Sequence, residues 1–506
     1  MGIKLFHKIL LSAIIILTVS CQPPDQQEVA PAPTTYTPDW ESLTQYPEAQ
    51  WLHDAKFGIY THWGVYSVPA YGNEWYPRWM YARDAEDNHF YRHHLETYGD
   101  PAEFGYKDFI PSFFAENFDA REWAELFLLA GARFAGAVAE HHDGFAMWNS
   151  NLTEWDALDK GPHLDILLEL ANAIRLRGMK FVTSFHHAQR WWHYEESYSL
   201  DNPDTKDTAF AGINKLYPPA HEPGTNPPAE YYIFWENKVR EVIDKYQPDY
   251  LWFDFGWHRP EFDPYKRELL SYYYNKSLEW GKEVVVSYKH DHLPKGAGIL
   301  DLERGKIDTL TKFKWITDTS IDHKSWCYID DPEYKSVNTL IDNLVDRVSK
   351  NGTLLLNVAP KADGSIPQKQ RELLLEMGQW LRANGEAIYN TRPWIRYGEG
   401  PTRHESGQFS EHGIDNYTAE DIRFTRRGDD LYAILLDWPE DGKVLIRSLG
   451  KGQPVNFRGI RDVSMVGNKG WLEWNRKREG LEVYLPEVQP TFHAHVLKIY
   501  VRQWKD

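Results

Sequence analysis

The feature that most constrains the fold is an alternation of short apolar stretches with helical stretches, running from residue 48 to residue 395. Several apolar stretches are nearly continuous, as expected for strands buried on both faces of a parallel sheet. Eight such units predict a closed (β/α)8-like barrel. The expected strands are Lys56–Thr61, Arg133–Ala139, Lys180–Ser184, Tyr250–Phe253, Glu283–Ser287, Ile299–Leu302, Lys314–Thr317 and Thr353–Val358. The clearest helices are Ala120–Leu129, Ile166–Arg177, Ala229–Lys245, Lys266–Gly281, Val337–Ser349 and Gln368–Asn384.

From residue 396 to residue 506 the pattern changes to short strands separated by Gly, Asp and Asn turns, without helices between them. Such spacing predicts a C-terminal β-sandwich of about a hundred residues. We find no cluster of catalytic residue types in it, so we expect it to pack against the barrel. The expected strands are Ile422–Phe424, Leu431–Leu436, Lys443–Ile446, Val463–Met465, Leu481–Leu485 and Val496–Tyr500.

The first twenty residues have the character of a targeting segment. Lys4 and Lys8 precede an apolar run that is too short to be a convincing membrane span, and Ser20 then precedes Cys21. This resembles a bacterial lipoprotein signal, which implies an exported protein that is lipid-anchored to the cell envelope through Cys21. An ordinary secretory signal is the alternative. Residues 21–47 begin rich in Pro, Ala and Gln and predict a disordered tether.

Composition excludes some functions and favours one. The net charge of −18 argues against a nucleic-acid partner, whose phosphates require a positive surface. An aromatic content of 15%, with 22 Trp and 30 Tyr, suits carbohydrate binding, because the apolar face of a sugar packs on flat rings. With Cys21 assigned to the lipid, Cys327 has no intrachain partner, so disulfides are not expected to stabilise the fold.

Polar residues follow nearly every expected barrel strand. Because the carboxyl ends of the strands of such a barrel lie on one face, these residues should form a single site. The sharpest example is the run Tyr250–Phe253, which leads directly into Asp254, a nucleophile or base by position or else a simple helix cap. The other polar residues at strand ends are His62, Glu140 to Asp143, His186, His187, Tyr288 to His290, Asp301 to Glu303, Asp318 and Asn357.

Two chemistries could use this ring of residues. Five histidines could hold zinc for hydrolysis, but neighbouring histidines on a strand point to opposite sides, and no His-Glu-x-x-His spacing occurs in the barrel. The other chemistry is glycoside hydrolysis by two carboxylates, with neutral imidazoles and Trp rings holding sugar hydroxyls. The second is favoured, so no metal or other cofactor is expected.

Several ordered motifs resemble the family 29 glycoside hydrolases, the α-L-fucosidases. The first runs from Ala55 to Pro69 (AKFGIYTHWGVYSVP) and continues with Glu74-Trp75-Tyr76. The others are Glu140 to Phe145 (EHHDGF), Leu251 to Asp254 (LWFD), Ser349 to Pro360 (SKNGTLLLNVAP) and Asn384 to Trp394, followed by similarity in the C-terminal strands.

The resemblance implies a retaining, exo-acting glycosidase that removes terminal α-L-fucose from an oligosaccharide or polysaccharide. The acidic composition leaves sulfated or carboxylated glycans open as substrates, because a locally basic pocket can still bind an anion. Asp254 falls on the family nucleophile. The residues that fall on fucose-binding positions are His62, Glu74, Trp75, His141 and His142. Trp326 is expected to pack on the fucose ring. The third strand departs from the family pattern, so a contact there would come from His186 or His187, and Arg190-Trp191-Trp192 could form a leaving-group subsite.

The acid/base is expected to be Glu303, which lies after the short sixth strand. As an acid it must be protonated near neutral pH, which requires burial or a nearby carboxylate. Asp291, Asp301 and Asp318 are alternatives, and Glu303 could instead simply pair with Arg304. Two other functions remain open at this point: a lipoprotein that binds fucose or glycan without hydrolysis, and a metal-dependent barrel hydrolase.

Overall fold

The computed structural model describes residues 35–411 and 417–504. The predicted signal, residues 1–20, and Cys21 lie outside these residues. Over the described ranges, no helix combines the length and apolar character needed to cross a bilayer.

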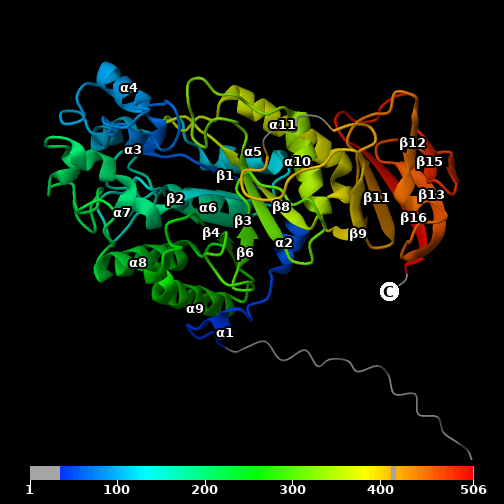
Figure 1. The fold of residues 1–506 in the computed structure, drawn as a ribbon, viewed down its shortest axis with the longest axis horizontal. Coiled ribbons are helices and arrows are strands. Elements are labelled where there is room, and N and C mark those ends of the chain that lie inside the picture. Colours follow the sequence, from blue (N-terminus) through cyan, green and yellow to red (C-terminus); the bar gives the residue numbers. More distant parts are fainter. Residues whose placement is uncertain (1–34, 412–416, 505–506) are drawn as a thin grey trace, which may run out of the picture. The chain divides into compact units, whose positions relative to one another are not determined.

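Eight parallel strands close a barrel in chain order, which confirms the predicted barrel (Figure 1). β1 pairs with β2 on one side and with β8 on the other, so no strand is left at an open edge. Each predicted strand overlaps an observed one. The barrel strands are β1 (Phe57–Thr61), β2 (Phe134–Glu140), β3 (Lys180–Phe185), β4 (Tyr250–Phe253), β5 (Val285–Lys289), β6 (Ile299–Asp301), β7 (Trp315–Ser320) and β8 (Gly352–Val358).

The six longest helices of the described chain alternate with barrel strands, except around β6. The side chains of Asp119, Asp165 and Ser336 accept the first backbone N–H groups of α5, α6 and α10, which fixes where these helices begin. In the described residues no helix lies between β5 and β6 or between β6 and β7, and β6 is only three residues long. These helices are α5 (Ala120–Leu129), α6 (Ile166–Leu176), α8 (Ala229–Tyr246), α9 (Asp263–Trp280), α10 (Val337–Ser349) and α11 (Gln368–Asn384).

Shorter helices precede and connect these units. They are α1 (Trp40–Leu43), α2 (Gln50–Ala55), α3 (Tyr76–Trp79), α4 (His89–Thr97) and α7 (Arg190–His193). The expected disordered tether was wrong for residues 36–47. Tyr36 is buried and its carbonyl accepts from Ser271 and Asn275 of α9. Tyr46 stacks on Tyr274 with centroids 3.9 Å apart, so aromatic burial orders this segment.

The C-terminal strands form two antiparallel sheets, as predicted. Their facing side chains make a separate apolar core that includes Trp394, Phe424 and Phe457. Two strands were not expected from the sequence, β9 and β14. The larger sheet has the order β13 (Phe457–Met465), β16 (His495–Trp504), β11 (Asp430–Leu435), β10 (Ile422–Arg427), β9 (Arg392–Glu399), and the smaller has β12 (Lys443–Ile446), β15 (Leu481–Tyr484), β14 (Trp474–Arg476).

The barrel and the sandwich meet at α10, which contacts β9 and β10. Arg423 of β10 is buried there, and its Nε donates to Asp346 of α10 at 2.7 Å. The connection between β9 and β10, described over residues 400–411 and 417–421 and called the β9–β10 loop below, returns from the sandwich to the barrel. Part of the sequence assigned to the sandwich therefore contacts the barrel strands.

Candidate active site

Asp254 follows directly on β4. Its backbone N–H donates to the Phe185 carbonyl at 3.1 Å, so the residue continues the ladder with β3. Gly256 has a φ of 103°, and a Cβ there would lie 2.7 Å from the backbone nitrogen of Gln189. Only glycine lets the chain turn away this tightly after the carboxylate.

Three side chains surround the Asp254 carboxylate. Lys289 Nζ, at the end of β5, donates to Oδ1 at 2.8 Å. His186 Nδ1 donates to Oδ2 at 3.1 Å, and His142 Nε2 lies 3.3 Å from the same oxygen. Burial raises the pKa of this carboxyl, but Lys289 and the two histidines outweigh it and hold the pKa well below its usual range. Asp254 is therefore buried and ionised.

Glu303 lies two residues beyond the end of β6. The same Lys289 Nζ donates to Glu303 Oε2. One ammonium group thus contacts both carboxylates, and their nearest oxygens lie within about 6 Å, twice the length of an N–H···O bond. Burial raises the pKa of Glu303 to about 7, with Asp318 and Asp254 acting in the same direction and Lys289 opposing. Between the two pKa values, up to about pH 7, Asp254 is thus ionised while Glu303 holds a proton.

Arg304 is directed away from Glu303, so the alternative that the two simply pair is wrong. The Arg304 guanidinium donates to the His323 carbonyl at 3.1 Å and lies 4.8 Å from the centroid of the Trp326 ring. Glu303 Oε2 instead accepts from Lys289.

The alternative acids occupy different surroundings. Asp301 and Asp318 are buried among barrel side chains, where Trp252 Nε1 donates to Asp301 at 3.2 Å and Tyr60 donates to Asp318 at 3.0 Å. Burial, followed by Asp318, holds the pKa of Asp301 well above its usual range. Asp291 is exposed. Of the four candidates, Glu303 is the one whose carboxylate shares an ammonium with Asp254.

Four of the five predicted histidines gather at the same face. The rings of His141 and His186 lie 4.6 Å apart, and those of His62 and His186 lie 5.0 Å apart. Burial lowers the pKa of His186 to about 4 and puts the pKa values of His62 and His141 well below the ordinary range, so these rings are neutral at pH 7. Asn357 of β8 orients His62 by accepting from its Nδ1 at 2.8 Å.

Two groups of these side chains are close enough to share a metal ion: His62, His141 and His186, and His142, His186 and Asp254. One of these ligands is already engaged in a way that a metal would disturb. Asp254 neutralises the Lys289 ammonium 2.8 Å away. A second cation on Asp254 would be repelled by that ammonium.

Aromatic rings and one further carboxyl flank the histidines. Trp75 stacks parallel to Phe255, with centroids 5.8 Å apart, and lies 4.8 Å from the His142 ring. On the other side, Trp326 lies 5.3 Å from the His62 ring, and its backbone N–H donates to Glu74 at 3.1 Å. The structure thus brings together the predicted residues Glu74, Trp75 and Trp326.

Two predicted features are not part of this cluster. His187 lies on the opposite side of β3, where its Nε2 contacts the Trp235 carbonyl of α8 at 3.3 Å. The predicted leaving-group segment is also buried: Arg190 bonds four backbone carbonyls, and Trp191 Nε1 donates to the Thr225 carbonyl. Both features support the packing of the loop after β3.

Three residues that organise the site were not assigned a role from the sequence: Lys289, Asn357 and Gln408. Lys289 and Asn357 occupy strand ends, so their position was a usable signal. Gln408 belongs to the β9–β10 loop, about a hundred residues after Glu303, and its side chain accepts from the Glu303 N–H at 2.5 Å. No local pattern indicates that contact.

Comparison with known proteins decides the family. The alpha-L-fucosidase family model matches residues 25–386, and the alpha-L-fucosidase C-terminal domain model matches residues 415–500. The chain belongs to the alpha-L-fucosidase family. The family and the glycosidase class expected from the sequence motifs are therefore confirmed.

Individual relatives match this chain over nearly its full length. Rat tissue alpha-L-fucosidase is 33% identical over 474 residues, covering 91% of this chain and 90% of the relative. Human tissue alpha-L-fucosidase is 32% identical, covering 95% and 94%. The crystal structure of Thermotoga maritima alpha-fucosidase in complex with fucose superposes with a TM-score of 0.72 at 30% identity, covering 92% of this chain and all of that chain.

Proposed function

We propose that the protein is a retaining, exo-acting α-L-fucosidase that uses Asp254 as nucleophile and Glu303 as acid/base. The observation that carries the proposal is the single Lys289 ammonium that contacts both carboxyls at the barrel mouth, with the pKa of Asp254 lowered and that of Glu303 raised. The family of the chain, and its similarity to an alpha-fucosidase in complex with fucose, support fucose as the sugar.

In the first step, an Asp254 carboxylate oxygen attacks C1 of the fucosyl residue. The bond between C1 and the leaving oxygen breaks, and that oxygen takes the Glu303 proton. The product is a neutral alcohol and a covalent fucosyl ester of Asp254. The low pKa of Asp254 keeps the nucleophile ionised, and the pKa of about 7 at Glu303 keeps the acid protonated near neutral pH.

In the second step, Glu303 acts as a base. It takes a proton from water, the water oxygen attacks C1, and the ester bond to Asp254 breaks. The negative charge of Asp254 is one of the effects that raise the pKa of Glu303, and the ester has no such charge. Ester formation therefore lowers the pKa of Glu303 and suits it to its second role.

The spacing of the two carboxylates favours retention. Retaining glycosidases hold the two carboxyl groups about 5–5.5 Å apart, whereas inverting ones hold them about 6.5–9.5 Å apart to admit water. The shared contact with Lys289 limits the nearest oxygens to about 6 Å. This favours direct attack by Asp254.

The neutral histidines and the aromatic rings would hold the sugar. A neutral imidazole can donate to one hydroxyl and accept from another, as a sugar ring requires. His141 Nδ1 is buried without a hydrogen-bond partner in the described residues, which leaves a polar atom for a fucose hydroxyl to satisfy. Asp254 and Lys289 are also almost fully buried. That burial suits a site that admits a single terminal sugar, as exo action requires.

The proposal is tested by the configuration of the first product. Proton NMR during early turnover of an aryl α-L-fucoside should show α-fucose before mutarotation, and β-fucose as first product would exclude double displacement. Full activity in the presence of a strong chelator is expected as well. Loss of activity that zinc restores would favour the metal-dependent hydrolase, and tight fucose binding without turnover would favour a binding lipoprotein.

We also propose export and anchoring to the bacterial cell envelope through lipidation at Cys21, which the basic start, apolar run and Ser20-Cys21 pair support. Expression of the full chain in a bacterial host with labelled fatty acid should label the protein and place it in the membrane fraction. Cys21→Ser should lose the label. Label retained in Cys21→Ser would contradict this assignment.

A further inference from the structure

The segment that carries Glu303 has little support from its own barrel unit. β6 is three residues long, and in the described residues no helix follows it before β7. The chain then turns sharply, since Arg304 has a φ of 42°. A backbone polar group buried in such a segment needs a partner from elsewhere. The partners come from the β9–β10 loop.

Gln408 bonds the backbone at and just before the acid/base position. Its Oε1 accepts from the Glu303 N–H at 2.5 Å, and its Nε2 donates to the Asp301 carbonyl at 3.0 Å. The next residue, Phe409, donates its N–H to the Glu303 carbonyl at 2.8 Å. Both backbone polar groups of Glu303 are therefore bonded to this loop.

The pairing extends beyond Glu303. The Glu411 N–H donates to the Arg304 carbonyl at 2.8 Å, and Lys306 and Gly407 exchange backbone hydrogen bonds of 2.9 and 3.3 Å. The two chains approach so closely that a Cβ at Gly305 would lie 2.6 Å from the Gly407 carbonyl oxygen. Loop residues 406–411 thus lie along residues 301–308 as a paired strand would.

Buried charges hold the loop against the barrel on one side. Glu411 accepts from Lys335 at 2.8 Å and from Asn343 of α10 at 2.7 Å. Burial raises the pKa of Glu411, but Lys335 and Arg347 outweigh it and hold the pKa well below its usual range. Glu411, two residues after Phe409, is therefore ionised and hydrogen-bonded to the barrel.

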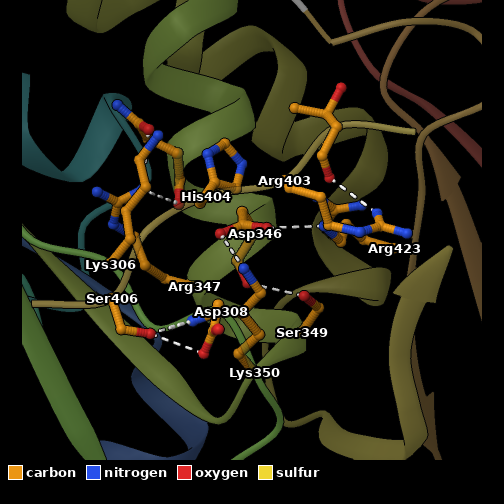
Figure 2. A network of polar contacts seen from close by, with 12 residues as sticks. Lys306, Asp308, Asp346, Arg347, Ser349, Lys350, Arg403, His404, Ser406 and Arg423 are labelled. Carbon is orange, nitrogen blue, oxygen red and sulfur yellow. Dashed lines mark hydrogen bonds and ion pairs between the residues drawn. The ribbon is translucent and has the colours of Figure 1, made fainter. Parts of the chain in front are cut away.

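A second anchor lies at the boundary of the sandwich (Figure 2). Asp346 of α10 accepts from Arg423 of β10 at 2.7 Å and from Lys350 at 2.8 Å, and all three residues are buried. Glu411 and Arg423 thus bond the chain that follows Gln408 to the barrel.

We propose that Gln408 is a positioning residue for the acid/base, supplied to the barrel by the C-terminal half of the chain. It fixes the backbone of residues 301–303 so that the Glu303 carboxyl faces Asp254 and the leaving oxygen. The proposal rests on the proposed role of Glu303. In this proposal the β9–β10 loop positions the acid/base in addition to packing against the barrel.

The test replaces Gln408 with methionine, which has a similar size but makes neither hydrogen bond. Turnover is measured on two α-L-fucosides, one with an acidic phenol as leaving group and one with an alcohol. The phenol needs little protonation as it departs, whereas the alcohol needs a well-placed acid. Gln408→Met should lower kcat/KM, which reports the first step, by about 10²-fold on the alkyl fucoside and change kcat/KM on the aryl fucoside much less.

The control is Ser406→Ala, which removes two hydrogen bonds between the same loop and Asp308 without touching residues 301–303. It should leave both substrates near wild-type rates. In Gln408→Glu, the side chain can still accept from the Glu303 N–H, so this variant should recover part of the alkyl rate. Its added charge should raise the pKa of Glu303 and move the basic limb of the pH profile upward.

Glu303→Gln separates this proposal from the function on which it rests. If Glu303→Gln shows the leaving-group dependence and Gln408→Met shows an equal loss on both substrates, or none, the positioning role of Gln408 is rejected while the acid/base assignment stands. If neither variant discriminates between the substrates, the acid/base assignment fails and the role of Gln408 fails with it.

Discussion

The carboxyl groups at the ends of β4 and β6 are held in place by different kinds of contact. Asp254 at β4 is held from inside the barrel by Lys289, His186 and His142, which lie at the ends of β5, β3 and β2. Glu303 beyond β6 is held through its backbone by a loop from outside the barrel. The first arrangement favours an ionised carboxylate and the second leaves a carboxyl with a pKa of about 7.

This difference shows how one barrel can present both an acid and a base. Hydrogen bonds and an ammonium directed at a carboxylate stabilise its charged form. A buried carboxyl that accepts from fewer donors is more stable in its neutral form. Lys289 belongs to both environments, so its removal should change both carboxyls.

The largest effect is expected at the β4 end. Asp254→Ala removes the nucleophile, and kcat on an aryl α-L-fucoside should fall by roughly 10⁴-fold or more. Asp291→Asn is the control, because Asp291 is exposed and was an alternative carboxylate. Steady-state kinetics with correctly folded proteins checks this. Comparable loss in both variants, or little loss in Asp254→Ala, would contradict the assignment.

At the β6 end, Glu303→Ala removes the acid/base and should lower turnover of a poor leaving group by roughly 10²- to 10⁴-fold. Azide, which needs no base, should then accelerate the variant on an aryl fucoside. The product should be a fucosyl azide with the configuration of the substrate, identified by NMR. Near wild-type turnover of the alkyl fucoside would remove Glu303 from the mechanism.

The link between the two ends is tested by Lys289→Met and the control Lys289→Arg. In the wild type, activity should fall as pH rises above about 7, because Glu303 loses the proton it must donate. Lys289 lowers the pKa values of both carboxyls. Its loss should therefore move both limbs of the pH profile of kcat/KM to higher pH, the two limbs reporting the coupled pair. Unchanged limbs in Lys289→Met would show that the ammonium does not set these pKa values.

The smallest effect is expected from a pair of neighbours at the end of β3. His186→Ala removes a hydrogen bond to the Asp254 carboxylate, which should cost about 1.5–3 kcal/mol, or roughly 10- to 100-fold in kcat/KM. His187→Ala, on the far side of the strand, should lower the melting temperature while leaving kcat/KM near wild type. Equal losses of activity would mean that His187 contributes to the site.

The same contrast explains what the sequence could predict. The barrel, the sandwich and Asp254 depend on local patterns: apolar runs, turn residues and a polar residue at the end of a strand. A local pattern does not determine the side of the barrel wall to which a strand-end side chain points. The outward position of His187 depends on its contact with Trp235 of α8. Gln408 and Glu411 depend on contacts between segments about a hundred residues apart, and no periodicity records such contacts.

The central claim, that the ionised carboxylate at β4 is the nucleophile and the protonated one at β6 is not, is tested most directly by trapping the intermediate. A fucosyl fluoride with fluorine at C2 should form the ester rapidly and hydrolyse it slowly, because the C2 fluorine destabilises the oxocarbenium-like transition state. Digestion and mass spectrometry should then place a single fucosyl label on Asp254. A label on Glu303, or turnover with no covalent species on any carboxylate, would contradict the account.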